Sequence, residues 1–318
     1  MKLSDLGEFG FIQRVRRWLP ASPAALGLLD DAAVIDVADI ECLVVTTDVL
    51  VEGVHFHLGW SKPDDVGFKS IAVSVSDLAA MGAQPRWVLV GIGAPPTMDE
   101  AVLEGLYAGI AEACVRFGVE VIGGDTARAT ELIVDVTALG VATDEPVRRS
   151  GARPGDVLAV TGPLGRAAAG VELLRIGRSD DGPACVEAHR KPSVRVDLAA
   201  TLRASGVHAA MDISDGLGSD AQRIAEASGV GVEIDADRVP IADDVRDLAV
   251  KHDWDVLSLA LGGGEDYELL VAGPADAVEA AGFIVVGRVI DDGAWLVVDG
   301  TREPLGEGYD NFRSGISS

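Results

Sequence analysis

Residues 61–93 have the sequence SKPDDVGFKSIAVSVSDLAAMGAQPRWVLVGIG, and this stretch decides the fold class. Pro63 suits the first turn of a helix, the two acidic residues after it favour the positive end of the helix dipole, and Gly82 ends the pattern. An apolar run from about Trp87 to Gly93 then predicts a strand. Because helical patterns and apolar strands alternate in this way along the chain, the sequence predicts an α/β protein.

The predicted helix carries one polar stripe. Ser70, Ser74 and Asp77 are spaced by four and three residues, so they share one side of the helix. The other residues from Ile71 to Met81 are almost all apolar or small, which leaves too little polar surface for a helix that is mostly exposed. We therefore expect the stripe, with its carboxylate, to face the interior of the protein.

Aspartates recur where acidic side chains are costly: at the ends of apolar strands, beside paired glycines and inside this apolar helix. They are Asp30, Asp31, Asp48, Asp77, Asp125, Asp212 and Asp215. A buried, unpaired carboxylate costs several kcal/mol or becomes neutral, and lysine and arginine are scarce around these positions. Several hard oxygen ligands favour Mg²⁺, which proteins commonly hold with carboxylates and substrate phosphates. The pattern therefore predicts a magnesium-dependent phosphoryl-transfer site.

Composition limits the classes of function. The 318 residues suffice for roughly two domains. Lys and Arg number 26 against 51 Asp and Glu, and the formal charge of −25 disfavours nucleic acid and anionic membranes as partners. Three widely spaced cysteines without a CxxC pair, and an N-terminus without an apolar signal segment, fit a cytoplasmic protein. No run approaches the roughly 18 apolar residues of a membrane span.

The segment TDEPVRRSGARPGD, residues 143–156, is rich in Pro, Gly and charge and predicts a domain boundary. We expect an N-terminal domain over 1–145 and a C-terminal α/β domain over 146–318. In the first, Thr97 and Glu100 form a capping-box pattern for a helix that ends at Phe117 and Gly118. Further expected elements are strands over 43–47, 120–122 and 132–141 in the N-terminal domain; in the C-terminal domain they are strands over 157–160, ending at 212 and over 232–235, and helices over 166–175, over 194–204 and after Gly216.

Several familiar chemistries have no support. There is no Walker A loop, no G-x-S-x-G and no H-E-x-x-H, and His55 with His57 is too small a set for zinc. Gly216, Gly218 and Ala221 resemble a dinucleotide fingerprint, with Asp235 about twenty residues further on. NAD fits poorly there, because neighbouring aspartates would repel its pyrophosphate unless a cation lay between them.

Longer motifs carry a resemblance to a known family. In chain order they are GLLDDAAV, VVTTDVLVEGVHF, KSIAVSVSDLAAMGAQP, VIGGDTAR, RRSGARPGDVLAVTG, DISDGL, GGGEDYEL and the C-terminal GYDNF. Together they cover nearly the whole chain, and it resembles the thiamine-monophosphate kinases, within the superfamily of aminoimidazole ribonucleotide synthetase. The match departs at Leu29, where that family usually has glycine.

The resemblance implies a two-domain α/β (α+β) fold of the aminoimidazole ribonucleotide synthetase type that dimerises through its N-terminal sheet. It also implies transfer of the γ-phosphate of ATP to thiamine monophosphate with Mg²⁺, giving thiamine diphosphate without a covalent intermediate. Two alternatives stay open. One is a sister ATP-dependent synthetase or ligase that acts on another small phosphorylated metabolite, and the other is an acidic cation-binding protein without catalysis.

The resemblance further implies roles for individual residues. The expected metal ligands are Asp31, Thr46, Thr47, Asp48, Asp77, Asp125, Asp212 and Asp215, with Asp30 assisting. No covalent nucleophile is expected, and charge stabilisation falls to Asp77, Asp125 and Asp212. The expected nucleotide contacts are Tyr107, Gly124, Asp125, Arg149 and Ser214, and the expected thiamine contacts are His55, Glu265 and Phe312.

Structural alternatives remain for several of these residues. Asp30 could form a turn, Asp215 could cap a helix and Arg149 could be a solvated linker residue. Glycines such as Gly124 and those of residues 262–264 could serve turns alone. Phe312 could cap the core of its own domain.

Overall fold

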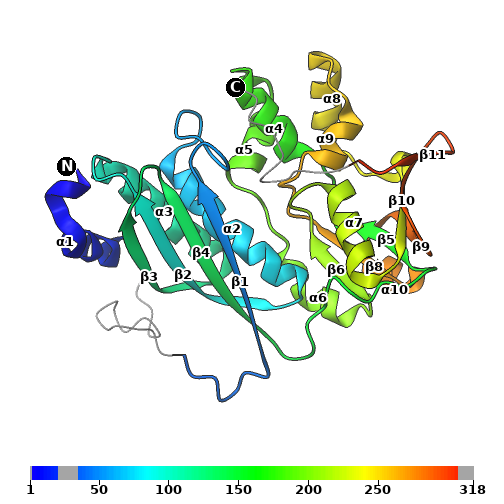
Figure 1. Ribbon diagram of the computed structural model, residues 1–318, viewed down its shortest axis with the longest axis horizontal. Coiled ribbons are helices and arrows are strands. Elements are labelled where there is room, and N and C mark those ends of the chain that lie inside the picture. Colours follow the sequence, from blue (N-terminus) through cyan, green and yellow to red (C-terminus); the bar gives the residue numbers. More distant parts are fainter. Residues whose placement is uncertain (1, 21–34, 307–318) are drawn as a thin grey trace. The chain divides into compact units, whose positions relative to one another are not determined.

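The computed structural model describes residues 2–20 and 35–306, which form two compact units (Figure 1). The N-terminal unit comprises the described residues as far as Leu78 together with Ala83–Glu145. The C-terminal unit comprises Ala79–Gly82 and the described residues from Pro146 onward. Each unit has its own sheet and its own buried interior.

The N-terminal unit is a four-stranded sheet with helices on one face (Figure 1). Its elements are α1 Leu3–Trp18, β1 Cys42–Val51, α2 Pro63–Ala80, β2 Gln84–Ala94, α3 Glu100–Phe117, β3 Glu120–Arg128 and β4 Ile133–Ala142. The strand order is β1-β4-β2-β3, and only β2 and β3 run parallel. Each expected strand of this region is present, and β1 and β3 are longer than predicted because pairing with neighbouring strands extends them.

Helices α2 and α3 cross in direct backbone contact. A Cβ atom added at Gly67 of α2 would overlap the carbonyl oxygen of Leu106, and one added at Gly109 of α3 would overlap that of Asp64. Because both crossing points lack side chains, the backbones of α2 and α3 can approach each other closely. The two serines of the polar stripe on α2 are buried, as predicted: Ser70 and Ser74 are at most 1% exposed, and Ser74 Oγ lies 3.3 Å from the carbonyl oxygen of Val136 in β4. Asp77, the third member of the stripe, is only partly buried.

Two local predictions for this unit are wrong. Helix α3 is capped by Asp99, whose carboxylate accepts the N–H of Ala101, and not by Thr97; Gly118 ends the helix in the left-handed conformation as expected. Gly123, Gly124 and Asp125 lie inside β3 and not at the end of a short strand. At Gly124 a Cβ would overlap the carbonyl oxygen of Val90 in β2, so strand pairing alone requires glycine there.

The C-terminal unit has a seven-stranded mixed sheet in the order β11-β10-β7-β9-β5-β8-β6. Its strands are β5 Val157–Val160, β6 Ala209–Asp212, β7 Gly231–Asp235, β8 Leu269–Gly273, β9 Ile284–Ile290, β10 Ala294–Val298 and β11 Thr301–Pro304. Its helices are α4 Arg166–Arg175, α5 Pro183–Arg190, α6 Ala199–Ala204, α7 Leu217–Ser228, α8 Asp243–His252, α9 Val256–Gly262 and α10 Ala275–Ala280, with short 3₁₀ turns between several of them.

Most elements predicted for this unit are present, with α4 matching its predicted bounds. The helix expected over 194–204 is a 3₁₀ turn, Val196–Leu198, followed by the short α6. The dinucleotide interpretation lacks its structural context, because β9, β5 and β8 separate β6 from β7. Gly216 instead has a positive φ of 106° and packs against the backbone of Leu261.

No helix in the described ranges, 2–20 and 35–306, is long and apolar enough to cross a membrane.

Candidate active site

Two acidic side chains of the N-terminal unit meet between β1 and α2. Thr46 Oγ1 in β1 donates a hydrogen bond of 2.5 Å to Oδ2 of Asp77 in α2, and Asp48 lies close enough to Asp77 to feel its charge. Burial, repulsion from Asp77 and weaker repulsion from Asp135 raise the pKa of Asp48 to about 6, against a hydrogen bond from Ser74 that lowers it. The structure therefore brings together three of the predicted metal ligands.

Asp48 also has an unsatisfied oxygen. Its Oδ2 is buried and has no hydrogen-bond partner among the described residues. A buried acceptor without a partner is costly, and a second carboxylate nearby increases the cost. A hard cation would satisfy this oxygen and screen the repulsion, so the oxygen donors of Thr46, Asp48 and Asp77 fit Mg²⁺.

Thr47 and Asp125 lie on the other face of the same sheet. Successive residues of a strand point to opposite faces, and Thr47 Oγ1 donates to Oδ1 of Asp135 at 3.0 Å instead of facing α2. The strand register aligns Asp125 of β3 with Asp135 through Gly91 of β2. The N-terminal unit therefore does not bring these two side chains to the Asp48–Asp77 pair, and their assignment as ligands stays a prediction.

The remaining predicted residues of this unit differ in exposure. Tyr107 is buried, and its ring packs against Phe11 and Trp18 of α1 with centroid distances of 6.1 and 5.8 Å. Burial also raises the pKa of the Tyr107 hydroxyl. His55 lies in the turn after β1, where its Nδ1 accepts the N–H of Val51 at 3.0 Å. That hydrogen bond assigns the proton of the neutral ring to Nε2.

In the C-terminal unit, two motifs far apart in sequence are joined by backbone hydrogen bonds. The loop Asp212–Gly216 follows edge strand β6, and the loop Gly262–Glu268 precedes β8. Ile213 N–H donates to the carbonyl oxygen of Glu268 at 2.8 Å, and the N–H groups of Tyr267 and Glu265 donate to those of Ile213 and Ser214 at 2.9 Å each. The pairing of β6 with β8 thus continues into both loops and places Ser214 beside Glu265.

Asp220 shapes the first of these loops. It is fully buried in the first turns of α7, and its Oδ2 accepts the N–H groups of Ser214 and Asp215 at 3.0 and 3.1 Å. Burial, followed by repulsion from Asp215, raises its pKa to about 7. Cationic side chains were expected to be scarce near the predicted aspartates, but Arg223 forms ion pairs with Asp215 and with Asp220. Asp215 does not cap α7, because the N-cap residue is Gly216.

Glu265 is held by a histidine for which the sequence gives no signal. His189 of α5 is 6% exposed, and its Nδ1 lies 2.6 Å from Oε2 of Glu265. Both Glu265 and Tyr267 have positive φ angles, 59° and 51°, which are unfavourable for residues with side chains. Such strain persists only where the surroundings fix it, and it is frequent at functional sites.

The other two acidic side chains of the second loop anchor it. Asp266 accepts the N–H of Gly165, the N-cap residue of α4, at 2.9 and 3.1 Å from its two oxygens, and burial raises its pKa to about 8. Glu268 accepts from Thr161 Oγ1 at 2.5 Å and from Arg195 Nη1 at 2.9 Å. Spacing along the sequence gave no signal for these contacts, since the partners are 73 to 107 residues apart.

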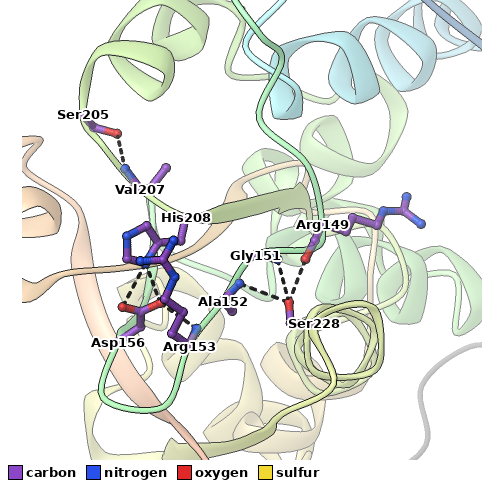
Figure 2. Close-up of polar contacts among 9 residues, drawn as sticks. All are labelled: Arg149, Gly151, Ala152, Arg153, Asp156, Ser205, Val207, His208 and Ser228. Atoms are coloured by element: carbon purple, nitrogen blue, oxygen red, sulfur yellow. Dashed lines mark hydrogen bonds and ion pairs between the residues drawn. The ribbon is translucent and has the colours of Figure 1, made fainter.

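Arg149 lies on the exposed segment before β5, and its backbone is fixed by contacts that Figure 2 shows. Asp212 is 2% exposed at the end of β6. Asp30, Asp31 and Phe312 lie outside the described residues. Among residues 2–20 and 35–306, no three Asp, Glu, His or Cys side chains form a ready metal-binding cluster. The predicted ligands are divided between the two units, and repulsion opposes the approach of several carboxylates without a cation.

Comparisons with known proteins agree over nearly the whole chain. Residues 29–142 match the family model "AIR synthase related protein, N-terminal domain", and residues 153–296 match the corresponding C-terminal domain. The chain is 36% identical to thiamine-monophosphate kinase of Aquifex aeolicus (strain VF5), covering 96% of this chain and 99% of the relative. It is 39% identical to that of Mycobacterium tuberculosis (strain H37Rv), covering 98% and 93%.

Solved structures agree with these relatives. The structure of AaThiL complexed with AMPPCP and TMP matches with a TM-score of 0.79 at 34% identity, over 97% of this chain and 98% of that one. The two-domain fold and the sequence matches extend over both units described above. The chain therefore belongs to the thiamine-monophosphate kinase family.

Proposed function

We propose that this protein transfers the γ-phosphate of ATP to thiamine monophosphate and releases ADP and thiamine diphosphate. The observation that carries the proposal is the backbone pairing of Asp212–Gly216 with Gly262–Glu268, which sets the predicted nucleotide contact Ser214 beside the predicted thiamine contact Glu265. A kinase must hold donor and acceptor next to each other. The relative crystallised with AMPPCP and TMP, an ATP analogue and the acceptor, supports the same pair of ligands.

Transfer requires mainly positioning and charge neutralisation, because both reactants are polyanions. An oxygen of the acceptor phosphate attacks the γ-phosphorus of ATP in line while the bond to the β-phosphate oxygen breaks. No protein nucleophile is needed. Bound Mg²⁺ would neutralise phosphate charge, and the fit of the oxygen donors of Thr46, Asp48 and Asp77 supports its binding there. Asp125, Asp212 and Asp215, with Asp31 and Thr47, complete the proposed ligand set.

Recognition of the acceptor is assigned to charge and stacking. The carboxylate of Glu265, fixed by His189, would face the cationic thiazolium ring. His55 and Phe312 complete the proposed contacts with thiamine, and Phe312 would stack on its rings. Tyr107, Gly124 and Arg149 are proposed to contact the nucleotide.

A dimer formed through the N-terminal sheet is also proposed. The face of β1 that points away from α2 exposes Leu43, Val45 and Val49, which are 40%, 55% and 47% exposed. Exposed apolar side chains on one sheet face, which here flank Thr47, are typical of protein interfaces. We assign dimerisation and metal binding to residues 1–145, and cytoplasmic localisation fits the cysteine usage.

Phosphorus NMR would test the activity directly. Protein incubated with ATP, Mg²⁺ and thiamine monophosphate is expected to yield the two diphosphate signals of thiamine diphosphate along with ADP. Asp77→Asn should reduce turnover by at least about a hundredfold, because it removes the negative charge that would bind Mg²⁺. The side-chain volume hardly changes. Asp276→Asn, at an exposed acid in α10, is the matched control and should retain the wild-type rate. Hydrolysis of ATP without thiamine diphosphate, or wild-type rates for Asp77→Asn, would contradict the proposal.

A further inference from the structure

The exposed segment that carries Arg149 is fixed by one serine hydroxyl (Figure 2). Ser228, the last residue of α7, lies 76 to 79 residues away in sequence. Its Oγ accepts the N–H groups of Gly151 and Ala152 at 3.1 and 3.2 Å and lies 3.3 Å from the carbonyl oxygen of Arg149, to which it can donate its proton. The single hydroxyl therefore pairs with the N–H groups of Gly151 and Ala152 and with the carbonyl group of Arg149.

The shape of this segment leaves few other ways to hold it. Gly151 has a φ of 125°, and a Cβ there would approach the carbonyl oxygen of His208, so the chain turns against the residue that precedes β6. Two successive N–H groups that point at one spot form a concave site for an oxygen. In this protein a side-chain oxygen of α7 fills that site. The arginine side chain itself extends away from the turn (Figure 2).

Further contacts fix the segment on either side. The carbonyl oxygen of Arg148 accepts the N–H of Ala210 in β6 at 2.8 Å. Beyond the turn, Asp156 accepts the N–H of Arg153 at 2.8 Å and contacts His208 Nδ1 at 2.9 Å (Figure 2). The carbonyl of Arg149 is thus tied to the last residue of α7, the helix that follows the loop carrying Ser214 and Asp215.

We propose that Ser228 is a positioning residue for nucleotide binding, and that it acts by holding the backbone of Arg149 so that the guanidinium meets the phosphates of ATP. The inference rests on the proposed kinase function and on the assignment of Arg149 to the nucleotide. Fixing the backbone removes conformational freedom that ATP would otherwise have to remove on binding. A flexible arginine on an unanchored segment would bind the same charge less tightly.

A double-mutant cycle tests the inference. Kd for AMPPCP is measured by titration calorimetry, and KM and kcat by steady-state assay, for the wild type, Ser228→Ala, Arg149→Ala and the double variant. Ser228→Ala is expected to raise Kd for AMPPCP and KM for ATP about fivefold, as expected for the loss of a hydrogen bond. In the Arg149→Ala background the same change should have less than about a twofold effect, because the two residues act as one unit. For Ser228→Ala alone, KM for thiamine monophosphate and kcat should stay unchanged.

Two further variants separate positioning from a general loss of stability. Ser228→Thr keeps the hydroxyl and should restore the wild-type Kd for AMPPCP. Ser205→Ala is the matched control, because the Ser205 hydroxyl bonds Leu202 and Val207 near the same segment without contacting Arg149. It should leave Kd unchanged. Alanine favours helices, so Ser228→Ala is expected to fold, and a melting curve checks this.

The outcomes distinguish this inference from the proposed function. If Arg149→Ala weakens nucleotide binding but Ser228→Ala does not, the positioning role is wrong and the kinase proposal stands. A full additive effect of Ser228→Ala in the Arg149→Ala background also overturns it. If Arg149→Ala binds AMPPCP like the wild type, both the assignment of Arg149 and the role of Ser228 fail. Absence of thiamine diphosphate formation by the wild type contradicts the function itself.

Discussion

Single side chains in this protein take their roles from partners that are distant in sequence. Glu265 is held by His189, which is 76 residues away in sequence and contacts its carboxylate at 2.6 Å. The contact is mostly buried, with side-chain exposures of 7% for His189 and 26% for Glu265. Buried hydrogen bonds to charged groups are stronger than those between neutral groups, so this pair holds the acidic group despite its unfavourable backbone angle.

Replacing His189 should therefore affect the acceptor and spare the nucleotide. His189→Leu is expected to raise KM for thiamine monophosphate about tenfold, the factor for one lost hydrogen bond to a charged group, while KM for ATP stays constant. His189→Asn keeps a donor and should recover part of the loss. Steady-state kinetics with both substrates is the measurement. An equal rise in both KM values with a lower melting temperature would mean that His189 serves only to stabilise the fold.

Sequence alone could point to candidate site residues only where the surroundings are local. Asp77 was identifiable because its own helix is apolar and places it in a stripe with Ser70 and Ser74. Asp220 gave no such signal, since an acid in the first turns of a helix is ordinary, and only the folded loop shows that it binds two backbone N–H groups. His189 was missed because its partner is defined by the packing of α5 and not by spacing.

At the scale of elements, an acidic side chain anchors the loop before β8 to the start of a helix. Asp266 accepts the N–H of Gly165 at the start of α4, so the loop before β8 and the helix support each other. The positive end of the helix dipole favours an acid there, but burial dominates and raises the pKa of Asp266 from its ordinary value of 3.8 to about 8.

This shift predicts how stability depends on pH. A carboxyl group whose pKa is higher in the folded state keeps its proton on folding. Its contribution to the free energy of unfolding is therefore complete below pH 3.8 and is lost as pH rises to about 8. The side chain of Asp266→Asn cannot ionise, so the variant should not lose this stability as pH rises. Urea unfolding at pH 5, 6.5 and 8.5 measures the free energy of unfolding of both proteins. Between pH 5 and pH 8.5, that of the variant should rise by more than about 1 kcal/mol relative to that of the wild type. Parallel pH profiles for the two proteins would contradict the assignment.

Elements with strong local signals were predictable, whereas their pairing was not. α4 and the apolar strands β5 and β7 follow from periodicity and flanking turns. Short helices with few apolar positions, such as α5 and α10, lack a clear pattern. β3 was predicted too short because glycines interrupt its apolar run, although β2 pairs with the strand along its whole length.

At the scale of the whole molecule, the sequence predicted an α/β protein, and the resemblance implied its two-domain family fold. The order of seven strands in the C-terminal sheet could not be predicted from residues alone, because five of its six neighbour pairs join strands that are not consecutive in the chain. Such pairings depend on contacts between distant segments, which local propensity does not encode.

The open face of the N-terminal sheet predicts the assembly state. Val45→Glu places a charge on the proposed dimer interface, where burial without a partner is unfavourable, and should convert a dimer into monomers. Val250→Glu is the matched control, since Val250 is 87% exposed on α8 and outside that face. Sedimentation velocity of both variants and the wild type decides the question. A monomeric wild type, or a dimeric Val45→Glu, would contradict the proposed interface.

The glycine crossing of α2 and α3 governs which evolutionary paths are open to the N-terminal unit. At Gly67 and Gly109 a new methyl group would meet backbone atoms of the opposite helix, not a side chain. A second substitution elsewhere could shrink a side chain, but none can shrink a carbonyl group. Any larger residue at these two positions must move a whole helix, and with it Asp77, so we expect lineages to drift around this crossing and leave the two glycines unchanged.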